Sequence, residues 1–164
     1  MAKRSDQILE NAFQLDSLDR KILRVLQRRA DISQADLALE VAASSASCYR
    51  RIKAMEAAGI LGPTVRLLDP MRIGRGLDVF CQVHMKAHDT KARKEFEAFL
   101  GTHPEVMECY SMSGEWDYLV RVVVADVRDY ERFLMQALLS HPAVASSSSH
   151  FALNRVKYTT EMPV

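Results

Sequence analysis

The sequence lacks any apolar run close to the roughly 18 to 20 residues that a helix needs to cross a bilayer. Its first residues, MAKRSDQILENAF, are charged and contain no apolar core of the kind found in secretory signals. We therefore expect a soluble, cytoplasmic protein with no membrane partner. Hydrophobic residues make up 48% of the 164 residues, which excludes a disordered chain and suffices for one domain or two small ones.

Cysteine is scarce, and the residues that catalysis or metal binding would need are scattered. Cys48, Cys81 and Cys109 include no C-x-x-C pair, which excludes a disulfide framework and argues against a structural zinc. Each is expected to be a small buried hydrophobe. The histidines have no metal-type spacing, and the sequence contains no nucleophile elbow or phosphate loop. We expect neither an enzyme nor a metal or cofactor site.

The N-terminal part has the pattern of three short helices. LDSLDRKILRVLQRRAD carries apolar residues at helical spacing, and Asp16 with Asp19 resembles an N-cap followed by an acid at the third position. Ser33 begins a second helix, and a break at 42–44 leads into SASCYRRIKAMEAAGI, which Gly59 ends. A tight turn before the third helix indicates a helix-turn-helix, and ILGPTVRLLD is expected to form a strand or hairpin wing.

Basic charge gathers in the same region. Residues 1–68 carry 11 Lys/Arg and 8 Asp/Glu, or +3, and residues 69–164 carry 11 and 13, or −2. No acid occurs between Glu40 and Glu56, so the polar side of the third helix is basic and rich in hydroxyls. Such a face favours docking in the DNA major groove over a generic helical core or a solvated basic surface. The candidate DNA-binding residues are Ser45, Ser47, Tyr49, Arg50, Arg51 and Lys53.

The C-terminal part changes from helical to mixed periodicity. DPMRIGRG, residues 69–76, is the predicted linker between a winged helix-turn-helix at 15–68 and a second domain at 77–164, with 1–14 as a polar extension. The second domain reads strand, helix, two strands, helix, strand, the βαββαβ order of a ferredoxin-like sandwich. The fold class is therefore α+β with two domains.

One face of this predicted sheet has no helix to cover it. Two helices cover a single face of a four-stranded sheet. The other face is expected to carry apolar residues such as Val120, Val122 and Val124, or their alternates, and to be buried by another subunit.

Taken in order, these segments resemble the Lrp/AsnC family of bacterial transcriptional regulators. The resemblance covers residues 15–163 and rests on six landmarks: LDSLDRKILRVLQ, SSASCYRRIKAMEAAGIL, VRLLDPMRIG, MSGEWDYLVRVVV, HPAV and VKYTTEMP. It implies a winged helix-turn-helix joined to an effector and oligomerisation domain. It also implies homodimers that assemble into tetramers or octamers, and a small effector, usually an amino acid. The other reading is an amino-acid-sensing module whose N-terminal helices serve protein contacts without direct DNA binding.

The stretch MSGEWDY contains the only tryptophan of the chain, and three readings apply to it. Catalysis by its two acids has no further support in the sequence. A plain hairpin would use glycine for the turn and the acids for solvation. If the loop forms an effector site, its backbone N–H groups near Ser113 and Gly114 would bind the carboxylate of an amino acid. Asp117 or Glu115 would bind the ammonium group. Trp116 would narrow this site or lie on a subunit interface.

The resemblance extends the candidate effector site beyond the hairpin. The family's G-[DE]-x-D-[YL] loop falls on Gly114, Glu115, Trp116, Asp117 and Tyr118. Threonines of the family's last strand correspond to Ser147 and Ser149 within SSSS, which keep a hydroxyl and lose a methyl. The sequence thus predicts a regulator whose DNA binding or assembly an amino acid modulates.

Overall fold

The computed structural model describes residues 13–164 and divides into two compact units. Unit 1 contains the residues up to Arg66 together with Lys157–Val164, and unit 2 contains Leu67–Val156. The expected second domain, 77–164, differs from this division because the last segment of the chain returns to unit 1. Residues 1–12, most of the expected polar extension, lie outside the described residues.

The described part of unit 1 contains three helices, each started by a side-chain cap. Its helices are α2 (Ser17–Arg28), α3 (Gln34–Glu40) and α4 (Ser45–Ala57). Asp16 and Asp19 form a reciprocal capping box at α2, and Ser33 and Ser44 cap α3 and α4. These caps confirm the predicted starts of the first two helices. The buried apolar residues are Ile22, Leu23, Leu37, Ala38, Val41, Cys48, Ile52 and Met55.

The turn between α3 and α4 depends on one unusual backbone conformation. Ala42 has a positive φ of 54°, which lets the chain reverse within the predicted break at 42–44. Gly59 has a φ of 71° just beyond α4, and its conformation suits a residue without a Cβ. Both features agree with the helix-turn-helix pattern of the sequence.

The predicted strand in ILGPTVRLLD is wrong. None of the described residues of unit 1 is in a strand, and residues 63–69 are irregular and exposed. The β-branched residues of the segment favour extended backbone, but a strand also needs a neighbour to accept its hydrogen bonds. The described part of unit 1 supplies no such neighbour. The segment expected to form the wing is therefore irregular here.

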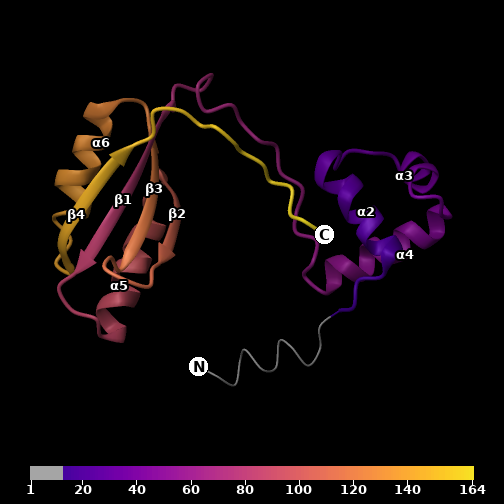
Figure 1. Cartoon of the computed structure of the whole chain (residues 1–164), viewed down its shortest axis with the longest axis horizontal. Helices are drawn as coiled ribbons and strands as arrows, with labels where there is room; N and C mark the ends of the chain where they lie inside the picture. The colour runs from indigo at the N-terminus through magenta and orange to yellow at the C-terminus, as the bar shows by residue number, and fades with distance from the viewer. Residues whose placement is uncertain (1–12) are drawn as a thin grey trace. The chain divides into compact units, whose positions relative to one another are not determined.

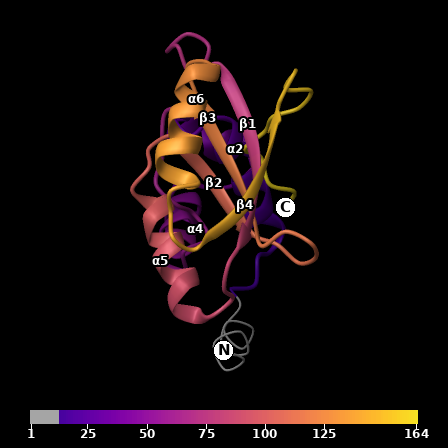
Figure 2. The same cartoon turned by 90° about the vertical axis from the view of Figure 1, so that its left-hand side faces the viewer.

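Unit 2 is a four-stranded antiparallel sheet with its helices on one face, as Figure 1 shows. The strand order is β2-β3-β1-β4, so the first and third strands are central. Figure 2 shows both helices on the same side of the sheet. The elements are β1 (Leu77–Met85), α5 (Thr90–Gly101), β2 (Val106–Ser111), β3 (Tyr118–Val124), α6 (Val127–Phe133), a π-helical turn (Leu134–Leu138) and β4 (Val144–Phe151). This is the predicted βαββαβ sandwich. No helix of the described chain is long and apolar enough to span a membrane.

The core of unit 2 lies between the sheet and its helices. The predicted inward residues of the first strand are buried there, and Phe96 packs on Tyr118 with ring centroids 5.2 Å apart. Val120, Val122 and Val124 also belong to this core, so they do not lie on the uncovered face. Their alternates Leu119, Arg121 and Val123 lie on that face instead. Buried residues of this core include Val79, Cys81, Val83, Met85, Phe96, Leu100, Tyr130, Phe133, Leu138 and Val144.

The uncovered face of the sheet combines apolar and charged groups. Arg121 lies at its centre, and its guanidinium is 2.8 Å from Asp78 and 2.7 Å from Glu108. Phe80 and Tyr110 on the neighbouring strands are more than a third exposed. Cys109, expected to be buried, is exposed because β2 is an edge strand that pairs only with β3.

We expect the core of unit 2 to depend strongly on Phe96, which has no exposed surface. Phe96→Ala leaves a cavity and should lower the free energy of unfolding by about 3 to 5 kcal/mol. Trp116 lies in unit 2, so chemical denaturation followed by its fluorescence reports this unit. Met107→Ala, at a side chain that is 57% exposed, is the matched control and should change stability little. Equal effects of the two substitutions would contradict this account of the core.

Candidate functional site

Helix α4 presents a polar face opposite its buried residues. Ser45, Tyr49 and Arg50 are exposed, and Tyr49 keeps 56% of its surface. Ser47 is half-buried, and its backbone N–H donates to the capping hydroxyl of Ser44. Among the described residues, Arg50 has no hydrogen-bond or ion-pair partner, so its guanidinium is available to a ligand.

Arg51 lies apart from this exposed group and serves as a link between helices. Its Nη1 atom is 2.7 Å from Asp16 Oδ2 and 2.7 Å from Asp19 Oδ1. The bonds to Asp19 and Asp16 raise the pKa of Arg51. The Asp19 side chain is only 4% exposed, so the contact is held at the edge of the core. Arg51 therefore fixes α4 against the start of α2.

Lys53 is exposed but also partly engaged. Its ammonium is 2.7 Å from Glu56 Oε2 and 5.8 Å from the centre of the Tyr49 ring. The hydrogen bond to Glu56 raises the pKa of Lys53. Such an exposed ion pair one helical turn apart is weak and exchanges readily with water or an anion.

The loop between β2 and β3 is a tight connection closed by backbone hydrogen bonds. Met112 N donates to Asp117 O at 2.8 Å, and Asp117 N donates to Val83 O at 3.0 Å. Gly114 has a φ of 116°, which disfavours any other residue at the turn. Ser113, Gly114 and Glu115 are exposed, as the hairpin reading and the effector reading both predict.

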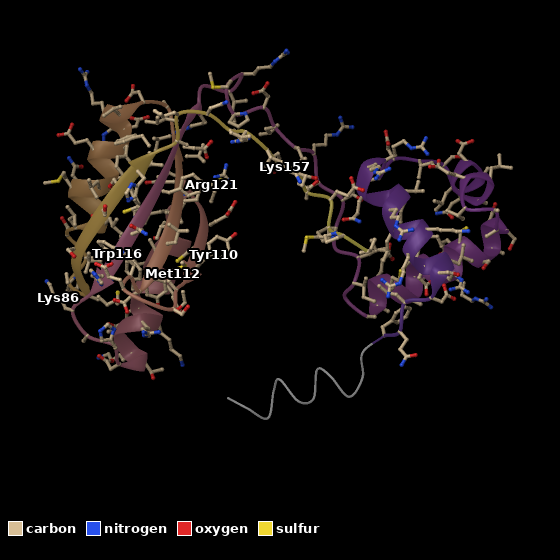
Figure 3. All side chains as sticks on the ribbon, in the orientation of Figure 1. Lys86, Tyr110, Met112, Trp116, Arg121 and Lys157 are labelled. Carbon is tan, nitrogen blue, oxygen red and sulfur yellow. The ribbon has the colours of Figure 1, made fainter. Side chains whose placement is uncertain are left out.

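Trp116 turns back from this loop onto the end of β1. Its ring is stacked on His84 with centroids 4.2 Å apart and an interplanar angle of 21°. Figure 3 shows Trp116 and Lys86 at the same end of the sheet, with Arg121 toward the other end. The indole is half-buried within this single chain.

Asp117 is the centre of the polar contacts beneath the loop. Its Oδ2 accepts from Met85 N at 2.8 Å, and its Oδ1 is 3.0 Å from His88 Nδ1 and 3.6 Å from Arg93 Nη2. Desolvation opposes ionisation here, but the Met85 N–H and the His88 and Arg93 charges hold the pKa of Asp117 below its usual value. His84 Nδ1 lies 3.7 Å away.

This arrangement limits what Asp117 can do for a ligand. The carboxylate is 11% exposed and already has its partners. Arg93 Nε, in contrast, is buried without a hydrogen-bond acceptor in the described chain. Across residues 13–164, no group of histidine, cysteine or acidic side chains is placed to hold a metal ion.

The remaining predicted effector residues lie elsewhere in the unit. Tyr118 is buried on the helix side, and its hydroxyl donates to Glu97 at 2.8 Å. Desolvation and this bond raise the pKa of Tyr118 to about 12. Ser147 and Ser149 pair with β1, which separates them from β3, and Ser149 shares a 2.5 Å hydrogen bond with Tyr130.

Sequence reasoning missed the three basic residues around Asp117. His84, His88 and Arg93 belong to β1, the following loop and α5. The structure pairs the first strand antiparallel with the third, which places the end of the first beside the start of the third. The element order alone does not show this pairing, so the sequence offers no direct signal for these residues.

Comparison with known proteins covers almost the whole chain. The model of a winged helix-turn-helix DNA-binding domain matches residues 15–61, and that of the Lrp/AsnC ligand binding domain matches residues 78–162. A DNA-binding transcriptional activator of Escherichia coli K12, DecR, is 38% identical over 92% of this chain and 99% of its own. The glutamate uptake regulatory protein of Zymomonas mobilis is 35% identical over 92% of this chain and 91% of its own.

Solved structures that resemble this chain are also transcriptional regulators. A transcriptional regulator of Neisseria meningitidis in complex with L-Met superposes with a TM-score of 0.88 at 37% identity, over 92% of this chain and 97% of that one. An AsnC family regulator of Agrobacterium tumefaciens gives a TM-score of 0.87 at 41% identity, over 91% and 97%. Both matches extend over the two units.

The contacts of Asp117 predict a pH-dependent contribution to the stability of unit 2. A carboxyl whose pKa is lowered by folding stabilises the protein above its ordinary pKa of about 3.9, and this contribution disappears as the pH falls through the folded value. Asp117→Asn should therefore be less stable than the parent at pH 7, with the difference shrinking toward pH 3. Urea unfolding followed by Trp116 fluorescence measures this. Glu115→Gln, in the exposed part of the loop, is the control, and a pH-independent deficit for Asp117→Asn would exclude the ionic contribution.

Proposed function

The chain belongs to the Lrp/AsnC family and is a DNA-binding transcriptional regulator with a ligand-binding domain, and we propose that an amino acid bound at the β2–β3 loop modulates its DNA binding or assembly. The alternative of a sensing module without direct DNA binding loses its support, because the DNA-binding model matches residues 15–61. As a bacterial-type regulator it would act in the cytoplasm on double-stranded DNA.

The polar face of α4 is our proposed DNA contact. Ser45, Tyr49 and Arg50 are exposed together, and a short hydroxyl beside a free guanidinium suits both phosphate and guanine. Ser47 and Lys53 would contact the backbone from the edges of this face. Arg51 is proposed as the residue that holds α4 in place, because both of its acidic partners belong to the start of α2.

The two arginines should behave differently when replaced. Arg50→Ala removes a phosphate or base contact, so it should weaken binding and, for a phosphate contact, reduce the slope of log affinity against log salt by about one. Arg51→Ala should weaken binding and lower thermal stability while leaving that slope unchanged. Fluorescence anisotropy with labelled DNA at several salt concentrations measures both. Arg132→Ala on α6 is the control, and a reduced slope for Arg51→Ala would assign it to DNA instead.

The proposed effector site uses the loop and the basic residues beside it. An amino acid needs an anionic partner for its ammonium and cationic partners for its carboxylate. Glu115 is exposed and would meet the ammonium, while Arg93 and His88 would meet the carboxylate beside the backbone N–H groups of 113–114. Asp117 would orient these basic side chains. The single supporting observation is that three basic groups surround one already bonded carboxylate.

We also propose that the chain self-associates through the uncovered face of its sheet. The uncovered sheet face carries Phe80, Tyr110 and the Arg121 ion pairs, which suits burial against a second copy of the chain. We propose a homodimer through this face and further association of dimers into tetramers or octamers. Trp116, Ser147 and Ser149 then have roles in the effector pocket or at a subunit contact.

A thermal-shift screen of the twenty amino acids tests the effector proposal. A ligand present at 100 times its Kd stabilises the folded state by about 2.7 kcal/mol, so a true effector raises the melting temperature. L-Met is the first probe, because the Neisseria meningitidis relative was solved with it. Arg93→Ala should abolish the shift without altering the fold, and Lys94→Ala, a neighbouring exposed base, should retain it. Absence of any shift at millimolar concentrations would remove amino acids from the proposal.

A further inference from the structure

The tail Lys157–Val164 is part of unit 1, although the polypeptide reaches it from β4 of unit 2. It contains all but the first residue of the landmark VKYTTEMP, to which neither DNA contact nor effector binding gives a role. Figure 1 shows the C-terminus beside α2. The tail therefore needs an explanation of its own.

The tail is bound to one side of α2 through main-chain atoms. Gln27 Nε2 donates to Met162 O at 3.1 Å, and Met162 N donates to Gln27 Oε1 at 2.6 Å. The Gln27 side-chain amide thus bonds both main-chain polar groups of Met162, as the backbone of a neighbouring β-strand would. One turn earlier, Arg24 donates to Val164 O at 3.0 and 2.7 Å, from Nε and Nη2.

Two further contacts hold the same segment. Arg28 lies one residue beyond Gln27, and its Nη2 is 2.7 Å from the Glu161 carboxylate. Val164 packs against the core of unit 1. Residues 24, 27 and 28 share one side of a helix, so the three contacts act together along a single line.

A docked tail has a mechanical consequence for the chain. The polypeptide passes from unit 1 to unit 2 at Arg66–Leu67 and returns at Val156–Lys157. While the tail is bound, the DNA-binding unit is attached by two chain segments, and a second attachment restricts the orientations that a single linker permits. Only residues 152–156 separate the end of β4 from the start of the tail.

We propose that Gln27 and Arg24 are positioning residues that dock the tail on α2 and thereby fix the half-site spacing that the assembled regulator accepts on DNA. The proposal rests on two copies binding two half-sites and does not depend on any effector. Two recognition helices read successive major-groove faces only at a spacing near one helical turn or a multiple of it. A unit held by one linker would tolerate other spacings.

The test measures affinity as a function of half-site spacing. Selection from random DNA with the full-length protein supplies an operator, which is then rebuilt with its half-sites displaced by about five and about ten base pairs. A single half-site completes the set. Gln27→Ala removes both Gln27 hydrogen bonds to Met162 without changing charge, and Met162→Pro removes the main-chain donor of one of them from the tail side. Met162→Ala and Lys21→Ala are the matched controls.

The parent and both controls should bind the half-turn displacement at least about tenfold more weakly than the in-phase operators. Gln27→Ala and Met162→Pro should bind all spacings within about twofold of one another, with single half-site affinity unchanged. The proposal would be overturned if these variants discriminated between half-site spacings as strongly as the parent does. It would also be overturned if they lost the same affinity for every DNA, including the single half-site. If two half-sites bind the parent no better than one, the assumed assembly fails instead, and analytical ultracentrifugation identifies that case.

Discussion

The antiparallel pairing of β1 with both β3 and β4 determines where every other part of unit 2 lies. Because β1 occupies a central position, its backbone at Val83 receives the N–H of Asp117 and its Met85 N–H meets the Asp117 carboxylate. The loop is thus fixed at the end of β1, directly beside His84. On its other edge, β1 pairs with β4, and the chain continues from the end of β4 into the tail. One strand therefore joins the candidate effector site to the return path into unit 1.

Local sequence signals predicted most of the fold because they act over a few residues. The capping acids at 16 and 19 and the alternation along β1 each depend on near neighbours, and the structure retains both. The strand predicted in ILGPTVRLLD was wrong for the opposite reason. Its residues favour extended backbone, but a strand requires a partner, and no local pattern shows whether one is present. The prediction that Cys109 is buried was wrong for a similar reason, since its exposure follows from the position of β2 at the sheet edge.

The candidate sites were harder to predict because composition does not reveal pairing. The residues of α4 were grouped by charge and helical side, yet Arg51 forms ion pairs with acids more than thirty positions earlier. Asp117 was expected to be open to a ligand ammonium, whereas His88 and Arg93 already surround it. In both cases a long-range contact changes a candidate ligand-binding group into one that organises its neighbours.

The tail contact with α2 also bears on how this chain can change during evolution. Gln27 recognises the N–H and C=O of Met162, groups that almost every amino acid offers in the same place. The side chain at position 162 is consequently free to vary while this contact persists, whereas Glu161 and Val164 dock through their side chains. Insertions within the tail differ from substitutions, since one residue inserted between Glu161 and Met162 would change the spacing between the Arg28 contact and the Gln27 contacts. The main-chain contacts thus tolerate most substitutions at position 162 but not a change in the length of the tail.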